Sequence, residues 1–205
     1  MSSRQFALVA IAAAALLMFG TARALPANVA RTGTASQSSI DPGGGNAGVA
    51  SRGIDGNRDG NFFHGSVTHT ANGDPDPSPG LFEWWDVTLS QRYSFEQIIV
   101  FNRTDCCTGR IEPFRLSVFN GATSVFSINV PSFVPDITGV DISGMTFTLT
   151  GQIGDRVRVQ LTHQDYLSLA EVEAYATPVP EPSALAFWAV GLIGLVLARS
   201  RRVDA

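Results

Sequence analysis

Apolar and polar residues alternate along several short stretches in the middle of the chain. These stretches are rich in β-branched and aromatic residues and cover positions 95–101, 114–119, 124–130 and 157–161. A period of two residues predicts β-strands with one buried face. Asn120-Gly121 and the glycine-containing segment 151–154 predict turns between them. Because no segment between the two chain ends sustains a helical period, the pattern predicts an all-β sandwich or barrel.

Two longer segments interrupt this pattern. Positions 41–48 are rich in glycine, and positions 71–81 contain Pro75, Pro77 and Pro79. Loops of this length between strands are often functional, although an insertion that the fold merely tolerates is equally compatible with them.

The N-terminus has the features of an export signal. Arg4 precedes an apolar run over positions 6–19, and Ala22-Arg23-Ala24 offers small residues where a signal peptidase requires them. The run is shorter than the roughly 20 residues that a membrane-spanning helix needs. We therefore predict a signal peptide over residues 1–24, with an uncleaved anchor as the alternative.

The C-terminus carries a second signal. A proline-rich segment at 177–183 is followed by an apolar run at 184–198 and by Arg199, Arg201 and Arg202. Basic residues after an apolar helix favour a cytoplasmic end. The Val-Pro-Glu-Pro element resembles the PEP-CTERM sorting signal, which implies removal by an exosortase-type enzyme; a plain single-span anchor is the alternative. We predict a central domain over 25–177 and a sorting tail over 178–205, and hence an exported protein at the periplasm-facing membrane, the cell surface or the extracellular matrix.

Charge excludes one class of partner. The chain has 14 basic residues, all of them arginine, against 18 acidic residues, with a net charge of −4. Several of the arginines lie in the two terminal signals, so the central domain is more acidic than the whole chain. Nucleic-acid binding requires clustered cations, and we therefore expect no nucleic-acid partner.

The densest chemical feature is the segment from Asn102 to Arg110, which contains Arg103, Asp105 and the adjacent pair Cys106-Cys107. A guanidinium group offers several rigid donors that can grip neighbouring hydroxyl oxygens, and a carboxylate between two such groups can orient them. Adjacent thiols in an oxidising compartment are expected to pair, and such a strained ring often marks a functional site. A surface salt bridge beside two unrelated thiols remains the alternative.

The segments 50–70, 84–89, 102–110 and 166–175 together resemble the F-type (fucose-binding) lectins. The similarity extends over about residues 28–176. It implies an all-β jelly-roll sandwich of the galactose-binding-domain type, with a sugar site in loops at one end. It also implies L-fucose or a fucose-containing glycan or exopolysaccharide as the ligand.

The resemblance assigns sugar contacts to particular positions. It implies that His69, Arg103 and Arg110 donate to the sugar, that Asp105 orients the arginines, and that a Cys106–Cys107 disulfide lies against the apolar edge of the ring. Phe62 and Phe63 are candidates for a pocket around the methyl group, although both fit an ordinary core equally well. His64 competes with His69 for the ligand role, and the Thr-His-Thr context favours His69, with His64 packing structurally.

The same resemblance implies a structural calcium ion. Its ligands would come from Asp55, Asn57, Ser66 and Glu171, with a backbone carbonyl near Arg52. These are hard oxygen donors of the kind that Ca²⁺ prefers. The alternative is a turn whose Asx side chains cap their own backbone.

The chain departs from the family pattern in two places. Many members carry a disulfide-forming cysteine pair at the positions of Val67 and Ala170, and both cysteines are absent here. The interval between His69 and Arg103 is also longer than in the family, with the excess at 71–83, which could alter the choice of glycan.

We expect a carbohydrate-binding protein without catalysis. The alternative is a structural or adhesion protein of the surface or matrix that binds exopolysaccharide or protein without fucose specificity. An enzyme is disfavoured because nothing in the sequence orients the acidic residues Asp74, Asp76 and Glu83, and no nucleophile–base pair is apparent.

Overall fold

The computed structural model describes residues 25–41, 48–73, 82–136 and 144–179. The predicted signal peptide lies outside these residues, as do the sorting tail beyond residue 179 and most of the two long loops. Over the described ranges, no helix has both the length and the apolar character needed to cross a membrane.

The described residues form strands joined by loops and short helical turns. The strands are β1 (Ala27–Asn28), β2 (Thr34–Gln37), β3 (Trp84–Asn102), β4 (Phe114–Asn120), β5 (Thr123–Val130), β6 (Gly144–Leu161) and β7 (Leu169–Pro178). The helical turns are all of the 3₁₀ type: η1 (Ala30–Thr32), η2 (Ala50–Ile54), η3 (Phe62–His64) and η4 (Thr108–Ile111). All four stretches of alternating residues lie in strands, which confirms the prediction made from their period.

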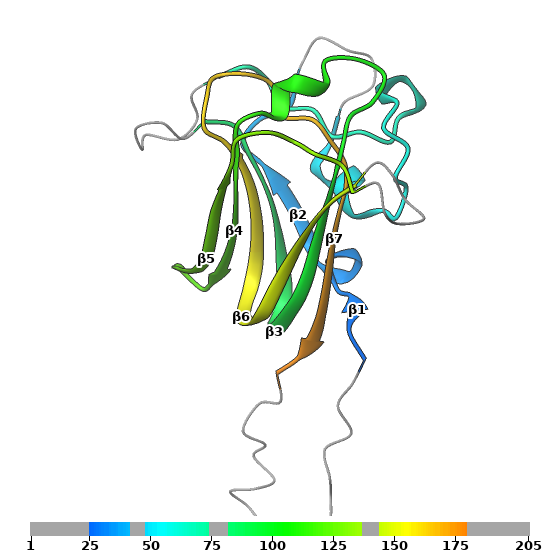
Figure 1. Ribbon diagram of the computed structural model, residues 1–205. Helices are drawn as coiled ribbons and strands as arrows, with labels where there is room; N and C mark the ends of the chain where they lie inside the picture. The colour runs from blue at the N-terminus through cyan, green and yellow to red at the C-terminus, as the bar shows by residue number, and fades with distance from the viewer. Residues whose placement is uncertain (1–24, 42–47, 74–81, 137–143, 180–205) are drawn as a thin grey trace, which may run out of the picture.

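All strand pairs are antiparallel, in the order β1-β7-β3-β6-β4-β5, with β2 also paired to β3. The long strands β3 and β6 are paired along most of their lengths, and the pair bends near its middle so that both strands run through both layers. The first part of β3, up to Thr88, pairs with β2 and the end of β6, whereas the part from Tyr93 pairs with β7 and the start of β6. The folded ladder makes the two layers of a β-sandwich (Figure 1).

The segment 151–154, predicted as a turn, lies inside β6. Gly151 has a φ of 67° and sits where the pairing of β3 with β6 shifts register. A bulge needs a residue that tolerates positive φ, and glycine supplies it. At Gly154 a Cβ atom would lie 2.5 Å from the carbonyl oxygen of Phe119, so glycine also permits the close approach of β4. The glycines thus bend a strand and do not end it.

The core lies between the layers. Alternate residues of the strands, among them Trp85, Val87, Leu116 and Val157, are fully buried. Their outward neighbours are mostly polar, as half-buried strands require.

A short antiparallel pairing ties the segment after η3 to the start of β7. The amide of Thr68 donates to the carbonyl of Leu169 at 2.8 Å, and the amide of Thr70 donates to that of Leu167 at 3.0 Å. This register places Val67 opposite Ala170, and both are fully buried in one small cluster with Phe101. The two positions where the family carries cysteines therefore face each other.

Installing both cysteines, Val67→Cys with Ala170→Cys, is expected to raise the free energy of unfolding by about 2–4 kcal/mol once oxidised, because the bridge closes a loop of roughly 100 residues. Thermal unfolding of the oxidised double variant against each single variant measures the effect. A double variant that fails to oxidise, or that gains no stability over the single variants, would contradict the register.

Candidate functional site

Loops gather at the end of the sandwich opposite the one from which β1 and β7 lead to the chain ends. In Figure 1 the short green helix η4 marks this loop-bearing end at the top, while the arrow of β7 points to the bottom. The segments after β3, after β6 and around η3 meet here. The sequence-predicted residues Phe62, His69, Arg103 and Arg110 all lie in them.

Arg103 is held by a bidentate ion pair. Its Nε and Nη2 atoms donate to the two carboxylate oxygens of Asp105 at 2.8 and 2.7 Å. Asp105 Oδ1 also accepts from the amide of Phe62 at 3.1 Å, which ties the two loops together. The hydrogen bonds from Arg103 are the main cause that lowers the pKa of Asp105 to about 2. Asp105 therefore stays ionised, and the guanidinium retains further N–H donors for a ligand.

A continuous chain of ring contacts links the two arginines. The guanidinium carbon of Arg103 lies 4.7 Å from the ring centroid of Phe62, and that of Arg110 lies 4.8 Å from the centroid of Tyr166. His69 lies between these two aromatic rings, at 5.2 Å from each centroid. The structure thus brings together residues separated by about one hundred positions in sequence.

Arg110 is more exposed than Arg103. Its Nε atom is 3.5 Å from Asp165 Oδ1, and about a third of its side chain is exposed. Within the described part of the chain nothing bonds its two terminal amino groups, so they can donate to a ligand.

His69 is buried, with 5% of its surface exposed. Its Nδ1 lies 2.8 Å from the carbonyl oxygen of Thr70, which can only accept, so Nδ1 carries a proton. Burial is the main cause that lowers the pKa of His69, and the nearby positive charges of Arg103 and Arg110 add to it, while Thr70 and Asp41 oppose it. The neutral ring offers Nε2 as an acceptor for a ligand hydroxyl; donation from Nε2 would need the protonated ring.

Ligand affinity is expected to fall with acidity because protonation of His69 removes this acceptor and adds a third positive charge beside the arginines. The lowered pKa puts the midpoint below the usual 6.5. Affinity should then be constant above that pH and decline by about tenfold for each unit below the pKa of His69. Binding isotherms across pH, with His163→Gln as a control for the neighbouring imidazole, measure this. An affinity that stays constant on acidification, for as long as the protein remains folded, would contradict it.

Cys106 and Cys107 are joined by a disulfide in the same loop. Cys107 has a φ of 58° and is the one non-glycine residue with positive φ in the described ranges. Strained backbone of this kind persists where the surrounding structure requires it, as at binding sites. The pair is partly exposed at the loop-bearing end and offers an apolar surface there.

The structure distinguishes the remaining candidates, Phe62, Phe63 and His64, by their position relative to the site. Phe62 packs on His69 and Arg103, whereas Phe63 is 77% exposed and packs edge-to-face with Phe62. Phe63 is therefore not a core residue. His64 was expected to pack structurally, but it is exposed and its Nδ1 lies 2.6 Å from Asp59 Oδ2.

The predicted metal-binding loop contains consecutive Asx turns. Asp55, Asn57, Asp59 and Asn61 each accept, through a side-chain oxygen, from the amide two residues later, at 2.7–3.1 Å. The loop therefore contains the backbone-capping Asx turns that the sequence offered as the alternative to a metal site. It does not exclude a cation, since carboxylate and amide oxygens can accept more than one contact.

Oxygen atoms around this loop fit a hard cation. The hydroxyl of Ser66, which is 1% exposed, bonds to the carbonyls of Asp59 and Asn61, bringing those oxygens together. Glu171 is fully buried; Oε1 accepts from the amide of Gly56 at 3.1 Å, and Oε2 has no hydrogen-bond partner. Burial raises the pKa of Glu171 to about 8, and the nearby charge of Asp55 adds to the rise. A buried carboxylate with an unpartnered oxygen needs a cation or a proton.

Two further observations bear on a metal ion. In the described ranges no group of three or more His, Cys, Asp and Glu side chains is arranged to hold a metal. Such a site would therefore depend on carbonyl, amide and hydroxyl oxygens beside its carboxylates, which Ca²⁺ accepts. Arg52 donates from Nη1 to the carbonyl of Val67 at 3.2 Å and so anchors η2 beside Ser66.

Sequence reasoning missed three neighbours of the site: Tyr166, Asp165 and Asp41. Tyr166 stacks between His69 and Arg110, Asp165 contacts Arg110, and Asp41 lies 3.6 Å from Nδ1 of His69. Each comes from a loop remote in sequence, and no local pattern identifies it. Glu83, which the sequence left without orientation, is buried and accepts from the hydroxyls of Ser38 and Ser39.

Comparisons with known proteins agree with this fold. The family model described as a NedA-like, galactose-binding domain matches residues 52–159. Fucolectin-5 of Anguilla japonica is 38% identical over 153 residues, which cover 73% of this chain and 76% of the fucolectin.

Solved structures give the same result. A fucose binding module of Streptococcus pneumoniae, SpX-3, has a TM-score of 0.61 and 31% identity, over 73% of this chain and 97% of the module. The lectin domain of lectinolysin, solved in complex with Lewis b antigen, has a TM-score of 0.60 and 31% identity, over 72% and 95% of the two chains.

A β-sandwich with arginine, imidazole and aromatic groups gathered in loops at one end defines a carbohydrate-binding domain of the galactose-binding-domain fold. Hydroxyl groups can be gripped by the arginines while aromatic and disulfide surfaces cover apolar edges of a sugar. The chain belongs to the F-type lectin family, to which the fucolectins belong. It is a non-enzymatic binding domain, as was expected from the absence of oriented carboxylates in the sequence.

Proposed function

We propose that this domain binds L-fucose, as the terminal sugar of a glycan or exopolysaccharide. The observation that carries the proposal is the contact chain from Arg103 through His69 to Arg110, which places two guanidinium forks on either side of one imidazole. Donors from both arginines and the Nε2 acceptor of His69 match adjacent hydroxyls and a ring oxygen. The similar eel fucolectins and the pneumococcal fucose binding module support fucose in particular.

Apolar contacts would complete recognition. The Cys106–Cys107 disulfide lies in the same loop as both arginines, and the Phe62 ring packs beside Arg103 and His69. We assign the disulfide to an apolar edge of the sugar and Phe62 to its methyl group. Phe63, being exposed, would contact only a larger glycan.

We also propose that Ca²⁺ stabilises the loop beneath this site. Glu171, Ser66, Asp55 and Asn57 would hold it, together with main-chain carbonyls of the loop around Arg52 and Asn61. The support is the buried, unpartnered Oε2 of Glu171 and the convergence of carbonyl oxygens on Ser66. The ion would neutralise the buried carboxylate and join β7 to the loop that carries Phe62.

The protein is proposed to act outside the cytoplasm, where its predicted signal peptide would send it. β1 and β7 both leave the sandwich at the end opposite the site (Figure 1). A predicted tail that follows β7 and meets a membrane, even transiently, would therefore direct the sugar site away from that membrane. Display of many copies on a surface would raise weak single-site affinity through avidity.

Calorimetric titration of the purified domain with L-fucose tests the function. A dissociation constant on the order of 10⁻⁶ to 10⁻³ M is expected for a small polar site. D-mannose serves as the control sugar and should bind at least tenfold more weakly. A folded protein that gives no saturable signal with L-fucose would refute the proposal and favour a matrix or adhesion role.

A further inference from the structure

A cavity of about 650 Å³ opens beside the loop that carries the two site arginines. Its lining comes from the end of β3, from η4 and the residues flanking it, and from the segment after β5. The lining residues are Asn102, Arg103, Thr104, Thr108, Gly109, Glu112, Phe133 and Pro135. None of these except Arg103 belongs to the candidate sugar site.

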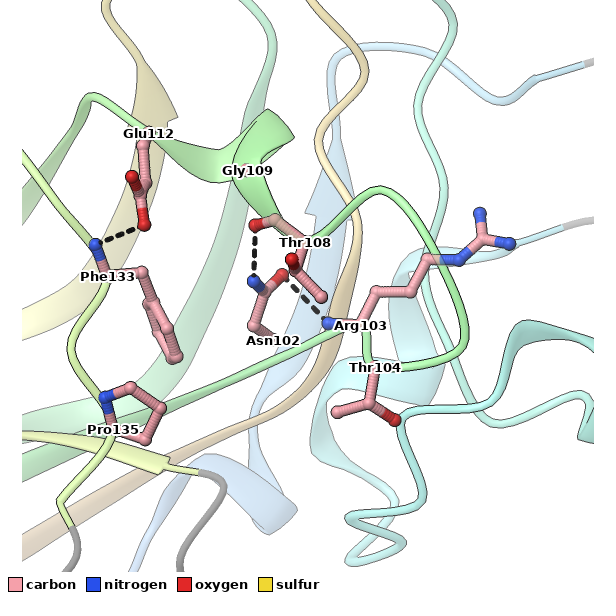
Figure 2. A pocket seen from close by; sticks show the side chains of 8 residues that line it. All are labelled: Asn102, Arg103, Thr104, Thr108, Gly109, Glu112, Phe133 and Pro135. Carbon is pink, nitrogen blue, oxygen red and sulfur yellow. Dashed lines mark hydrogen bonds between the residues drawn. The ribbon is translucent and has the colours of Figure 1, made fainter.

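This cavity and the sugar site lie on opposite sides of one loop. Figure 2 shows the guanidinium of Arg103 pointing away from Glu112, Phe133 and Pro135. It points toward Asp105 and Phe62, which belong to the sugar site. Asn102 fixes the loop between them: its Nδ2 donates to the carbonyl of Thr108, and its Oδ1 accepts from the amide of Arg103, both at 2.8 Å. A single loop therefore separates the cavity from the sugar site, and the two hydrogen bonds of Asn102 hold that loop in place.

The cavity has an apolar side and a polar side. The Phe133 ring and Pro135 lie on one wall, in the segment after β5, while Asn102 and Thr108 lie on the opposite wall (Figure 2). Phe133 is held in place because its amide donates to Oε1 of Glu112 at 2.7 Å and its ring packs on Phe114. The other carboxylate oxygen of Glu112 has no hydrogen bond to a described residue and can accept from a ligand.

These features select a class of ligand. The volume lies within the range of small-molecule sites, and an aromatic ring facing hydroxyl and carboxylate groups suits a molecule with an apolar face and a polar rim. A pyranose has both. The charged group turned toward the cavity is Glu112, since the Arg103 guanidinium points away, so an anionic sugar would be repelled.

We propose that this cavity is a second saccharide-binding site, which takes a neutral pyranose across the disulfide loop from the first. That the ligand is a saccharide rests on the proposed function. The pyranose is either a further unit of the glycan held at the first site or part of a separate glycan chain.

The test is an NMR titration of the isotope-labelled protein carrying Arg110→Ala, which weakens the first site and leaves the cavity lining intact. The probes are the methyl glycosides of D-galactose, D-glucose and D-mannose. At least one should give saturable shifts at the amides of Gly109 and Phe133. Phe133→Leu should weaken that binding by tenfold or more, and Phe126→Leu, a matched change on β5 outside the cavity, should not.

The variant Glu112→Gln distinguishes the structural role of Glu112, which holds Phe133, from its role in binding the ligand. The amide oxygen of glutamine can still accept from Phe133, so the segment stays in place, while the charged acceptor is lost; a fall of about threefold to tenfold in affinity is expected. Absence of saturable shifts for all three glycosides, or shifts that Phe133→Leu leaves unchanged, would overturn the proposal.

Fucose binding at the first site and pyranose binding in the cavity can be tested independently of each other. L-fucose added to the unmodified protein reports the first site through shifts at His69 and Tyr166, whereas the hexosides report the second through Gly109 and Phe133. A fucosylated oligosaccharide that shifts both groups with one dissociation constant, weakened by either Arg110→Ala or Phe133→Leu, identifies a single glycan spanning both sites. Two independent constants identify separate chains.

Discussion

Arg103→Ala is expected to lower the affinity for L-fucose by at least 100-fold. Arg103 would supply at least two hydrogen bonds from a charged donor, each of which contributes about 1.5–3 kcal/mol, and every 1.4 kcal/mol is a factor of ten in affinity. The variant also removes the partner of Asp105, whose pKa should return toward its ordinary range. Calorimetric titration measures the affinity, and circular dichroism confirms that the sandwich remains folded.

Two further variants separate charge from geometry at this position. Arg103→Lys keeps the positive charge but loses the planar fork that binds Asp105 in two places, and it should remain impaired by at least tenfold. Arg92→Ala removes an exposed arginine of β3 near the fold-over, far from the loops, and should bind normally. Full affinity in Arg103→Lys would show that the positive charge alone suffices. It would contradict the proposal that the planar guanidinium group of Arg103 binds the sugar.

Removal of calcium is expected to lower the melting temperature by about 8–16 °C. A ligand present at about 1,000 times its dissociation constant stabilises the native state by about 4 kcal/mol, and a domain of this size shifts by about 2–4 °C per kcal/mol. Scanning calorimetry with saturating Ca²⁺ and with excess chelator measures the difference. Sugar affinity should fall as well, because the loop that holds Phe62 and His69 is tied to β7 through Glu171.

Glu171→Gln should abolish the response to chelator, since it removes the buried charge that the ion neutralises. Glu173→Gln is the matched control: Glu173 is also buried on β7 but is paired with Arg58 at 2.8 Å. That variant should lose stability equally with and without calcium. A melting temperature indifferent to chelator in the unmodified protein would favour the run of Asx turns as the whole explanation of this loop.

Much of the fold could be predicted from local pattern. Alternation of apolar residues identified the strands around Val100, Leu116 and Val157, because half-buried strands require it whatever the topology. The pattern failed at Gly151, where a strand bends without ending. A glycine with positive φ has the same local signature in a bulge as in a turn, and only the partner strand decides between them.

By itself, the sequence determined the alternating stretches that lie in β3, β4, β5 and the end of β6. It also determined the acidic and lysine-free charge balance and the local cluster of Arg103, Asp105 and the adjacent cysteines, since each depends on composition or on near neighbours. Tertiary structure alone decided that Tyr166 and His69 complete a line between Arg103 and Arg110, and that Val67 faces Ala170. It also decided that a cavity lies behind the same loop. These contacts depend on how the paired strands β3 and β6 bend together. Long-range pairing of this kind produces no periodic sequence pattern in the residues that it joins.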